Sequence, residues 1–202
     1  IGEMRLALND AAKGLAPGGA YFAAFAAGKA IMGSHRNVGS RHVSILDDHD
    51  HVFGAKLRFS AEAASEHQVV AGVALQLFTL GIPCVYYGTE AGLSGGAEPA
   101  CREAMPWGDP QQWPHDLCLF IASLATLRQD QPALRGTDLE IALLPGSEGD
   151  QGLRLLRRDP ACGAALELVV NRSRTSPLPL ACSTGAVLWP PELAGGALPA
   201  AL

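Results

Sequence analysis

The chain has 202 residues and a formal net charge of −5, and 48% of its residues are hydrophobic and 17% charged. This composition is typical of a soluble globular protein with a hydrophobic core and excludes a disordered chain. The 15 basic residues are scattered singly, so no basic stripe is available for a phosphate backbone, and nucleic acid is not an expected partner.

Two further classes are not indicated. The apolar stretch Val69–Val85 is interrupted by Gln76, Gly81 and Pro83, and it changes from helical to strand-like character. It therefore predicts core, and no membrane partner is expected. The five cysteines form no Cys-x-x-Cys pair, which argues against a zinc or redox motif and favours buried free thiols.

The chain opens at Ile1 directly in a helical pattern, without the regions of a signal peptide. We therefore expect an internal piece of a longer protein. Any address label would lie upstream, so the compartment stays open, with the cytoplasm slightly favoured.

The first elements expected are two helices and a strand. Apolar residues recur at helical spacing near the start: Met4, Leu8, Ala11 and Leu15. With Gly14 as a stop, they predict a helix that ends near Lys13. A second short helix is expected at Tyr21–Ala30, then a loop at Gly33–Arg41 and a short buried strand at Val43–Leu46.

A longer helix and a second strand follow. Ser60 is a good N-cap for a helix whose apolar stripe runs to Leu80, and Gly81 ends it. Ile82–Tyr87 is the next expected strand.

A long loop, Gly88–Gln112, leads to a helix that starts at about Pro114, a residue suited to a first helical position, and ends before Pro132. The alternation of strand, loop and helix implies parallel strands with right-handed crossovers. From Leu134 the pattern changes to short β-like runs separated by Gly, Pro and Ser. These runs are Leu139–Leu144, Leu153–Arg157, Ala165–Asn171, Leu178–Ala181 and Ala186–Trp189.

An acidic, histidine-rich run, Asp47-Asp48-His49-Asp50-His51, follows directly on the first expected strand. Such a run costs repulsion and desolvation, which favours a functional site. Carboxylates and imidazole at strand ends can hydrogen-bond the vicinal hydroxyls of a sugar. On this run alone a solvated acidic loop is an equally good interpretation. A metal site is not predicted, because alternate side chains of an extended segment point to opposite faces.

A second motif decides between these interpretations. Gly81-Ile82-Pro83-Cys84-Val85-Tyr86-Tyr87-Gly88-Thr89-Glu90 resembles the eighth barrel strand of the α-amylase family of glycoside hydrolases, entered through Gly-x-Pro and left as Tyr-Tyr-Gly-x-Glu. Ile45-Leu46-Asp47-Asp48-His49-Asp50 resembles the seventh-strand motif Phe-x-x-Asn-His-Asp. The two motifs stand in the family's order with one helix between them.

The resemblance implies an α/β fold: the C-terminal portion of a (β/α)8 TIM barrel, with its last two to three βα units in residues 1–133. A small antiparallel all-β domain, a β-sandwich, is expected in residues 134–202. Beyond Leu134 the resemblance is architectural only.

The resemblance also implies roles for the acidic run. Asp50 would be the third family carboxylate, a transition-state stabiliser that hydrogen-bonds the sugar hydroxyls at the cleavage point. His49 would donate to the same sugar. Asp48 departs from the usual Asn and only accepts hydrogen bonds when ionised, so it is a substrate-binding candidate of altered chemistry. For Asp47 and His51 we expect solvent-facing structural roles rather than direct sugar contact, since neither matches a functional position of the family.

Further substrate-binding candidates follow the second strand. Tyr86 and Glu90, with Tyr87, either stack on and bind sugar or pack at the barrel mouth. Arg102-Glu103-Ala104-Met105-Pro106-Trp107 resembles an Arg-x-x-Met-x-Trp stretch of members that act on small oligosaccharides. Arg102 and Trp107 are therefore outer-subsite candidates, with a packed loop anchor as the alternative for each.

A retaining glycosidase needs two carboxyl groups about 5 Å apart, as nucleophile and as general acid. In the family they come from the fourth and fifth strands, which have no counterpart here, and the isolated chain is predicted to be inactive. The expected function is part of an α-amylase-type glycosidase or transglycosidase, with an α-glucan or α-glucoside as substrate. No cofactor is expected, and calcium in a full-length enzyme cannot be read here.

The open strand edges of a partial barrel need a cover, either an N-terminal barrel half or self-association. The alternative function is a non-catalytic carbohydrate-binding or assembly module with a degenerate half-barrel. A family member that has lost catalysis is a third possibility.

Overall fold

The computed structural model describes residues 2–49, 58–63, 65–95, 100–108, 113–146, 149–173, 176 and 178. Its elements are α1 (Gly2–Lys13), α2 (Gly18–Met32), α3 (His35–Arg41), β1 (Val43–Ser44), α4 (Phe59–Glu62), α5 (Glu66–Phe78), β2 (Ile82–Pro83), the 3-10 turn η1 (Ala100–Arg102), α6 (His115–Asp130), α7 (Pro132–Arg135), β3 (Asp138–Gly146), β4 (Gly149–Arg158) and β5 (Ala165–Asn171).

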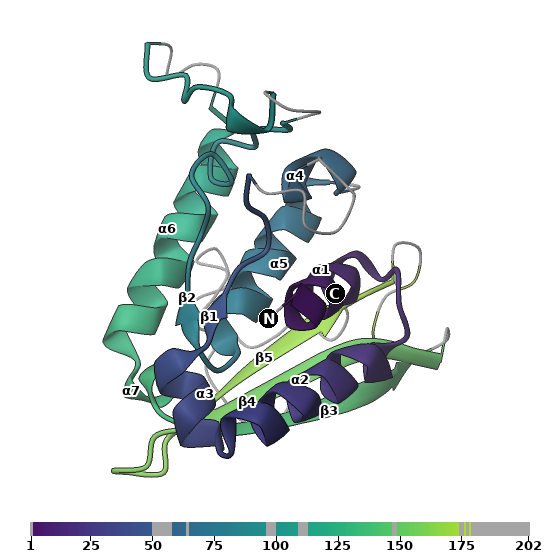
Figure 1. The fold of residues 1–202 in the computed structure, drawn as a ribbon, viewed down its shortest axis with the longest axis vertical. Helices are drawn as coiled ribbons and strands as arrows, with labels where there is room; N and C mark the ends of the chain where they lie inside the picture. The colour runs from purple at the N-terminus through teal and green to yellow at the C-terminus, as the bar shows by residue number, and fades with distance from the viewer. Residues whose placement is uncertain are drawn as a thin grey trace.

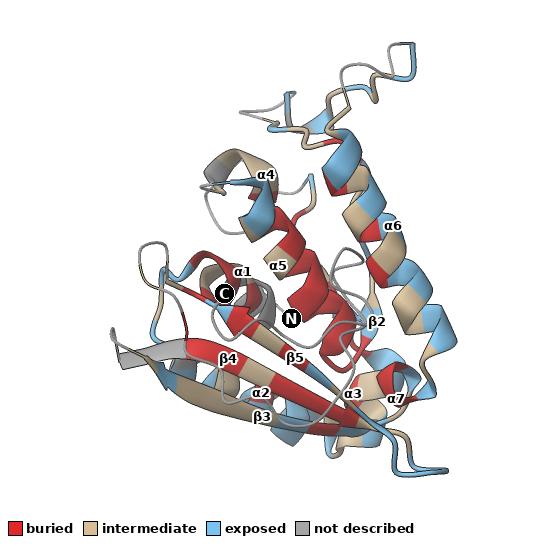
Figure 2. Cartoon of the chain, turned by 180° about the vertical axis from the view of Figure 1, so that it is seen from behind, coloured by how far each residue is buried: buried red, intermediate tan, exposed pale blue. Residues whose placement is uncertain are grey.

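Helix α5 occupies the centre of the molecule. It contacts α1 and β5 on one side and α6 on the other, while α2 covers β3 and β4 (Figure 1). Residues 72–78 are all buried, and the ribbon of α5 is red along the part that runs away from α4 (Figure 2). A helix that is apolar all round belongs in a core, as the sequence predicted for this stretch. Among the residues that the structure describes, no helix is long and apolar enough to cross a membrane.

The first two helices lie where the sequence predicted them. α1 ends at Lys13, because Gly14 adopts a left-handed φ of 68°. α2 is longer than expected and ends at Gly33, whose N–H donates to the Lys29 carbonyl at 2.8 Å. Leu15 lies beyond the first helix and is 63% exposed, so it is not part of the apolar stripe.

The expected loop at Gly33–Arg41 is wrong: residues 35–41 form α3. Ser34 caps it, since its hydroxyl accepts a 3.1 Å hydrogen bond from the Asn37 N–H. Val38 is the buried residue of this short helix. A helix with a single buried residue shows no apolar periodicity in its sequence. The N-cap was the available signal.

The start of the central helix was also misplaced. Ser60 lies inside α4, a separate short helix, and Ser65 is the N-cap residue of α5. Two short helices at a corner allow Phe59 to pack on α5, where a Cβ on Gly72 would lie 2.5 Å from its ring. The glycine in the helix therefore makes room for an aromatic side chain. Pro114 is the N-cap of α6 rather than its first residue.

The two parallel strands are shorter than predicted. β1 and β2 pair only at Val43 with Ile82 and at Ser44 with Pro83. Beyond them, the Gln76 side chain donates to the carbonyls of Ser44 at 2.7 Å and Cys84 at 2.9 Å. Gln76 thus joins both strands from α5, and the parallel arrangement with a helical crossover is confirmed.

Strands β3, β4 and β5 form an antiparallel sheet in chain order, as expected. Leu153 and Leu155 of β4 are fully buried and belong to the same hydrophobic core as Leu8 of α1. The sheet and the helices thus share one core, and the predicted division into two domains between residues 133 and 134 stays a prediction. Two further strands were expected, at Leu178–Ala181 and Ala186–Trp189. Of these residues the structure describes only Leu178.

The expectation of buried thiols is wrong for two cysteines. Cys84 and Cys162 are free and exposed. Cys84 follows the point where the parallel pairing ends, and Cys162 lies in the turn between β4 and β5.

Three arginines hydrogen-bond the carbonyls at helix ends. Arg157 on β4 is buried and donates five hydrogen bonds of 2.6–3.2 Å: to the carbonyls of Phe78 and Thr79 at the end of α5, of Leu134 and Gly136 at the end of α7, and of Asp138 at the start of β3. Arg128 donates to the Leu77 and Gly81 carbonyls, and Arg172 to those of Ala11 and Ala16. Cationic donors satisfy the free carbonyls at helix C-termini. The sheet is therefore fastened to α5 and α7 by Arg157.

His42, just before β1, makes stability depend on pH. It is 8% exposed, and its Nε2 has no partner among the described residues. Burial lowers the His42 pKa, so the folded chain keeps the ring neutral while the unfolded chain binds a proton below about pH 6.5. Stability is therefore expected to fall as pH falls below that value.

The His42→Leu variant should lose less stability between pH 7.5 and 5.5 than the natural chain. Urea unfolding at both pH values measures this, with His67→Gln, on the exposed start of α5, as the control. An unchanged pH slope in His42→Leu would contradict the assignment.

Candidate functional site

Asp47 lies buried at the end of β1, so the expectation that it faces solvent is wrong. It is 5% exposed. Its Oδ2 accepts a 3.1 Å hydrogen bond from the Phe59 N–H, and its Oδ1 accepts one of 3.2 Å from the Thr89 hydroxyl. Burial raises the Asp47 pKa, while these bonds and the charge of Arg58 oppose the rise. The carboxylate joins the β1 end to the segment after β2.

Arg58 is the cation that faces Asp47. Its side chain is fully buried, and its Nε lies 3.5 Å from Asp47 Oδ2, an ion pair without hydrogen-bond geometry. Its Nη2 donates to the Tyr87 carbonyl. The guanidinium carbon lies 4.6 Å from the ring centre of Tyr86 and 5.2 Å from that of Tyr87. The side chain therefore contacts both strand ends.

The tyrosines connect this buried pair to His49. Their rings meet edge to face with centres 4.7 Å apart. The exposed His49 ring lies 6.0 Å from the Tyr86 ring at an angle of 37°. Tyr86 is thus part of the packing at the strand ends, and it also borders the histidine that the motif predicted.

The segment after η1 is held by hydrogen bonds of its backbone and of the Glu103 side chain. The Tyr87 hydroxyl donates to the Glu103 carbonyl at 3.0 Å, and Glu103 Oε1 accepts from the Gly95 N–H at 2.7 Å. Farther along, the Trp113 indole N–H donates to the Pro106 carbonyl at 3.0 Å. Hydrogen bonds therefore hold this segment at Glu103 and at Pro106.

The outer-subsite candidates lie on this anchored loop. Arg102 is exposed, and Trp107 is 74% exposed. The Trp107 ring centre lies 5.7 Å from that of Trp113 at 46°. One side of Trp107 thus packs while most of its surface stays open, so both interpretations of this residue stand.

The structure brings His49 and Tyr86 together, and places Asp48 and Glu90 half-buried on the same two segments. Asp50 and His51 lie outside the described residues. Within the residues that are described, no three His, Cys, Asp or Glu side chains are grouped to hold a metal, and the expectation of no metal stays a prediction. Sequence reasoning gave no role to Arg58, which lies in neither motif, or to Thr89, which occupies the variable position of Tyr-Tyr-Gly-x-Glu.

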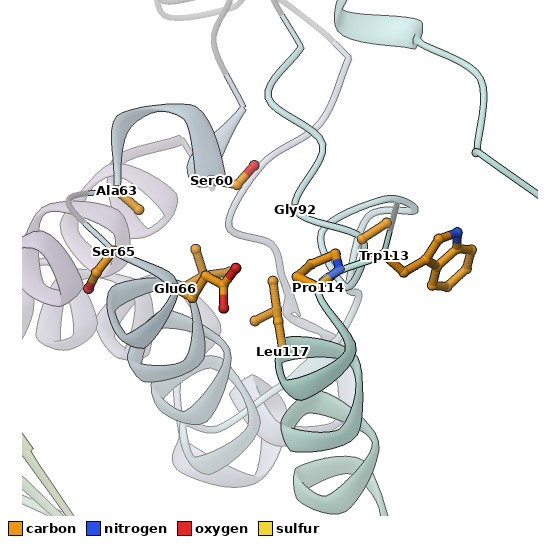
Figure 3. A pocket seen from close by; sticks show the side chains of 10 residues that line it. Ser60, Ala63, Ser65, Glu66, Gly92, Trp113, Pro114 and Leu117 are labelled. Carbon is orange, nitrogen blue, oxygen red and sulfur yellow. The ribbon is translucent and has the colours of Figure 1, made fainter. Parts of the chain in front are cut away.

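A separate pocket of about 510 Å³ lies between the starts of α5 and α6. Glu66 and Leu117 point into it from the two helices, whereas the Trp113 ring points away (Figure 3). Its other lining residues are Ser60, Ala63, Ser65, Val69, Ala91, Gly92 and Pro114. It shares no lining residue with the Asp47, Arg58 and Tyr86 cluster.

The comparisons agree with the motifs. The chain is 35% identical over 136 residues to a cyclomaltodextrinase of Bacillus sp., a match that covers 67% of this chain and 23% of that protein. A solved cyclomaltodextrinase structure superposes with a TM-score of 0.70 at 27% identity, over 96% of this chain and 32% of the other. The chain belongs to the α-amylase family of glycoside hydrolases.

A second similar solved structure is the cyclic α-maltosyl-(1→6)-maltose hydrolase of Arthrobacter globiformis in complex with that sugar. It shows a TM-score of 0.66 at 25% identity, over 88% of this chain and 37% of the hydrolase. No family model matches the chain. The chain spans about a quarter of the length of its curated cyclomaltodextrinase relative.

Proposed function

We propose that this chain is the C-terminal part of an α-amylase-type enzyme that cleaves or transfers α-glucosidic bonds. The observation that carries the proposal is the strand-end cluster: His49 beside Tyr86, on segments fastened by Asp47 and Arg58. β1, α5 and β2 are read as the seventh strand, seventh helix and eighth strand of a TIM barrel, and α6 as the eighth helix. Active sites of such barrels lie at the carboxyl ends of the strands.

In this proposal the chain supplies the sugar-binding side of the site. His49 and Asp50 hydrogen-bond hydroxyls of the sugar at the cleavage point, and these bonds strengthen as the ring becomes oxocarbenium-like. Asp48, Tyr86 and Glu90 are proposed as further substrate-binding residues. Arg102 and Trp107 are proposed for an outer subsite. The nucleophile and the general acid come from other strands. The reaction therefore retains the anomeric configuration and needs no cofactor.

The proposed partner is the rest of the barrel. Val43, Ile82 and Val85 are 36–49% exposed on or next to the two short strands. Apolar side chains on a two-stranded sheet match the faces that neighbouring barrel strands cover. Self-association of this chain would cover the same surface, and the α-glucan or α-glucoside substrate would bind above it.

The test is an assay of the full polypeptide encoded by the gene, beside the 202-residue chain, on cyclomaltodextrin and maltose. Product anomers are followed by NMR. We expect α-configured products from the full polypeptide and no turnover by the chain alone. Inverted products, or equal turnover by the chain alone, would contradict the proposal.

The alternative, a non-catalytic carbohydrate-binding or assembly module, is decided by the same gene. An upstream reading frame with Gly-x-Arg-x-Asp and a later strand-end Glu supports the enzyme. A start near Ile1 with sugar binding but no turnover supports the module.

A further inference from the structure

We propose that Arg58 is a positioning residue of the sugar site. It fastens the carboxyl end of β1 to that of β2, and it holds the Tyr86 ring beside which His49 lies. The inference rests on the proposed function and adds to it a residue that belongs to neither strand motif.

The two polar groups that Arg58 contacts lie on different segments of the chain. Asp47, two residues before His49, faces Arg58 Nε at 3.5 Å. The Tyr87 carbonyl, next to Tyr86, accepts from Arg58 Nη2. One planar guanidinium thus contacts the Asp47 carboxylate on one side of the site and the Tyr87 backbone on the other, which the point charge of a lysine does not do.

The face of the guanidinium acts on the rings. Its carbon lies 4.6 Å from the centre of Tyr86, within the range of cation–π contact. Tyr86 in turn lies 6.0 Å from His49. A displacement of Arg58 therefore reaches the histidine through a single intervening side chain.

Two glycines lie against this arginine. A Cβ on Gly95 would lie 2.5 Å from Arg58 Cγ. A Cβ on Gly88 would first meet the Leu93 side chain and would lie 3.1 Å from Arg58 Nη1. Both glycines have positive φ, 63° and 84°. Apolar residues of similar volume often stabilise a buried site at least as well as an ion pair, so stability alone does not explain a buried arginine here. A role in positioning the site explains why an arginine is buried there.

The first measurement uses the 202-residue chain and does not depend on catalysis. NMR of Arg58→Lys and Arg58→Met should show loss of the nuclear Overhauser contact between the His49 and Tyr86 rings. Arg128→Met is the matched control, because Arg128 also donates to backbone carbonyls but at the other end of α5. It should lower the melting temperature and keep the contact. Persistence of the contact in both Arg58 variants would overturn the proposal.

The second measurement uses the full polypeptide on cyclomaltodextrin. We expect kcat/KM of Arg58→Lys to fall by about 10- to 100-fold, mostly in kcat, since small misplacements cost that much. Arg128→Met should stay within about 2-fold at a temperature where it is folded. Loss of the ring contact with unchanged kcat/KM would overturn the positioning role. If the Arg58 variants lose the ring contact but the natural full polypeptide cleaves no α-glucan, the proposed function alone is overturned.

Discussion

Arg157→Met is expected to lower the free energy of unfolding by about 3 to 5 kcal/mol, because several buried carbonyls lose their donor at once. The guanidinium satisfies carbonyls at the ends of α5 and α7 and at the start of β3, at 2.6–3.2 Å. Burial lowers the Arg157 pKa to about 10, which leaves it charged at neutral pH. Methionine fills similar space and donates nothing.

Urea unfolding of the 202-residue chain, followed by far-ultraviolet circular dichroism, measures this loss. The matched control is Arg158→Met, on the same strand, whose side chain makes exposed ion pairs with Glu140 and Asp138. Exposed pairs contribute little, so its midpoint should hardly move. If Arg157→Met does not fold, Arg157→Lys, with three donors, should fold with an intermediate midpoint. Equal midpoints for the Arg157 and Arg158 variants would refute the role.

The two arginines show what the sequence could and could not predict. Period-2 alternation in β4 put Leu153, Leu155 and Arg157 on one face, and the strand itself was predicted well. The alternation gave no reason to expect an inward arginine, since its partners are main-chain carbonyls that come together only in the fold. The end of α1 and the positions of β3, β4 and β5 followed from local chemistry, whereas the hydrogen bonds that join the sheet to the helices did not.

The site shows the same division. The motifs placed His49 and Tyr86 at neighbouring strand ends, and the structure confirms that they lie together. Asp47 was expected to face solvent because it matches no functional position of the family, but Arg58, eleven positions later, pairs with it. Pairing across an intervening loop leaves no periodic signal. The roles of Asp50, Asp48, Glu90, Arg102 and Trp107 stay predictions.

Asp50→Asn in the full polypeptide is expected to lower kcat/KM on cyclomaltodextrin by about 10²- to 10⁴-fold, as loss of contacts specific to the transition state does. The amide keeps the size of the carboxylate, so folding and the melting temperature should be unaffected. Because the lost bonds strengthen as the ring gains positive charge, most of the effect should fall on kcat.

Asp48→Asn is the matched control for that result, because it makes the same chemical change two residues earlier and restores the asparagine of the family motif. An amide at this position can donate as well as accept, so turnover should stay near the natural level or rise. If Asp50→Asn retained near-natural turnover, Asp50 could not be the transition-state carboxylate. If Asp48→Asn were instead the inactive variant, the essential carboxylate would be Asp48, and the departure from the motif would mark a rearranged site rather than a tolerated substitution.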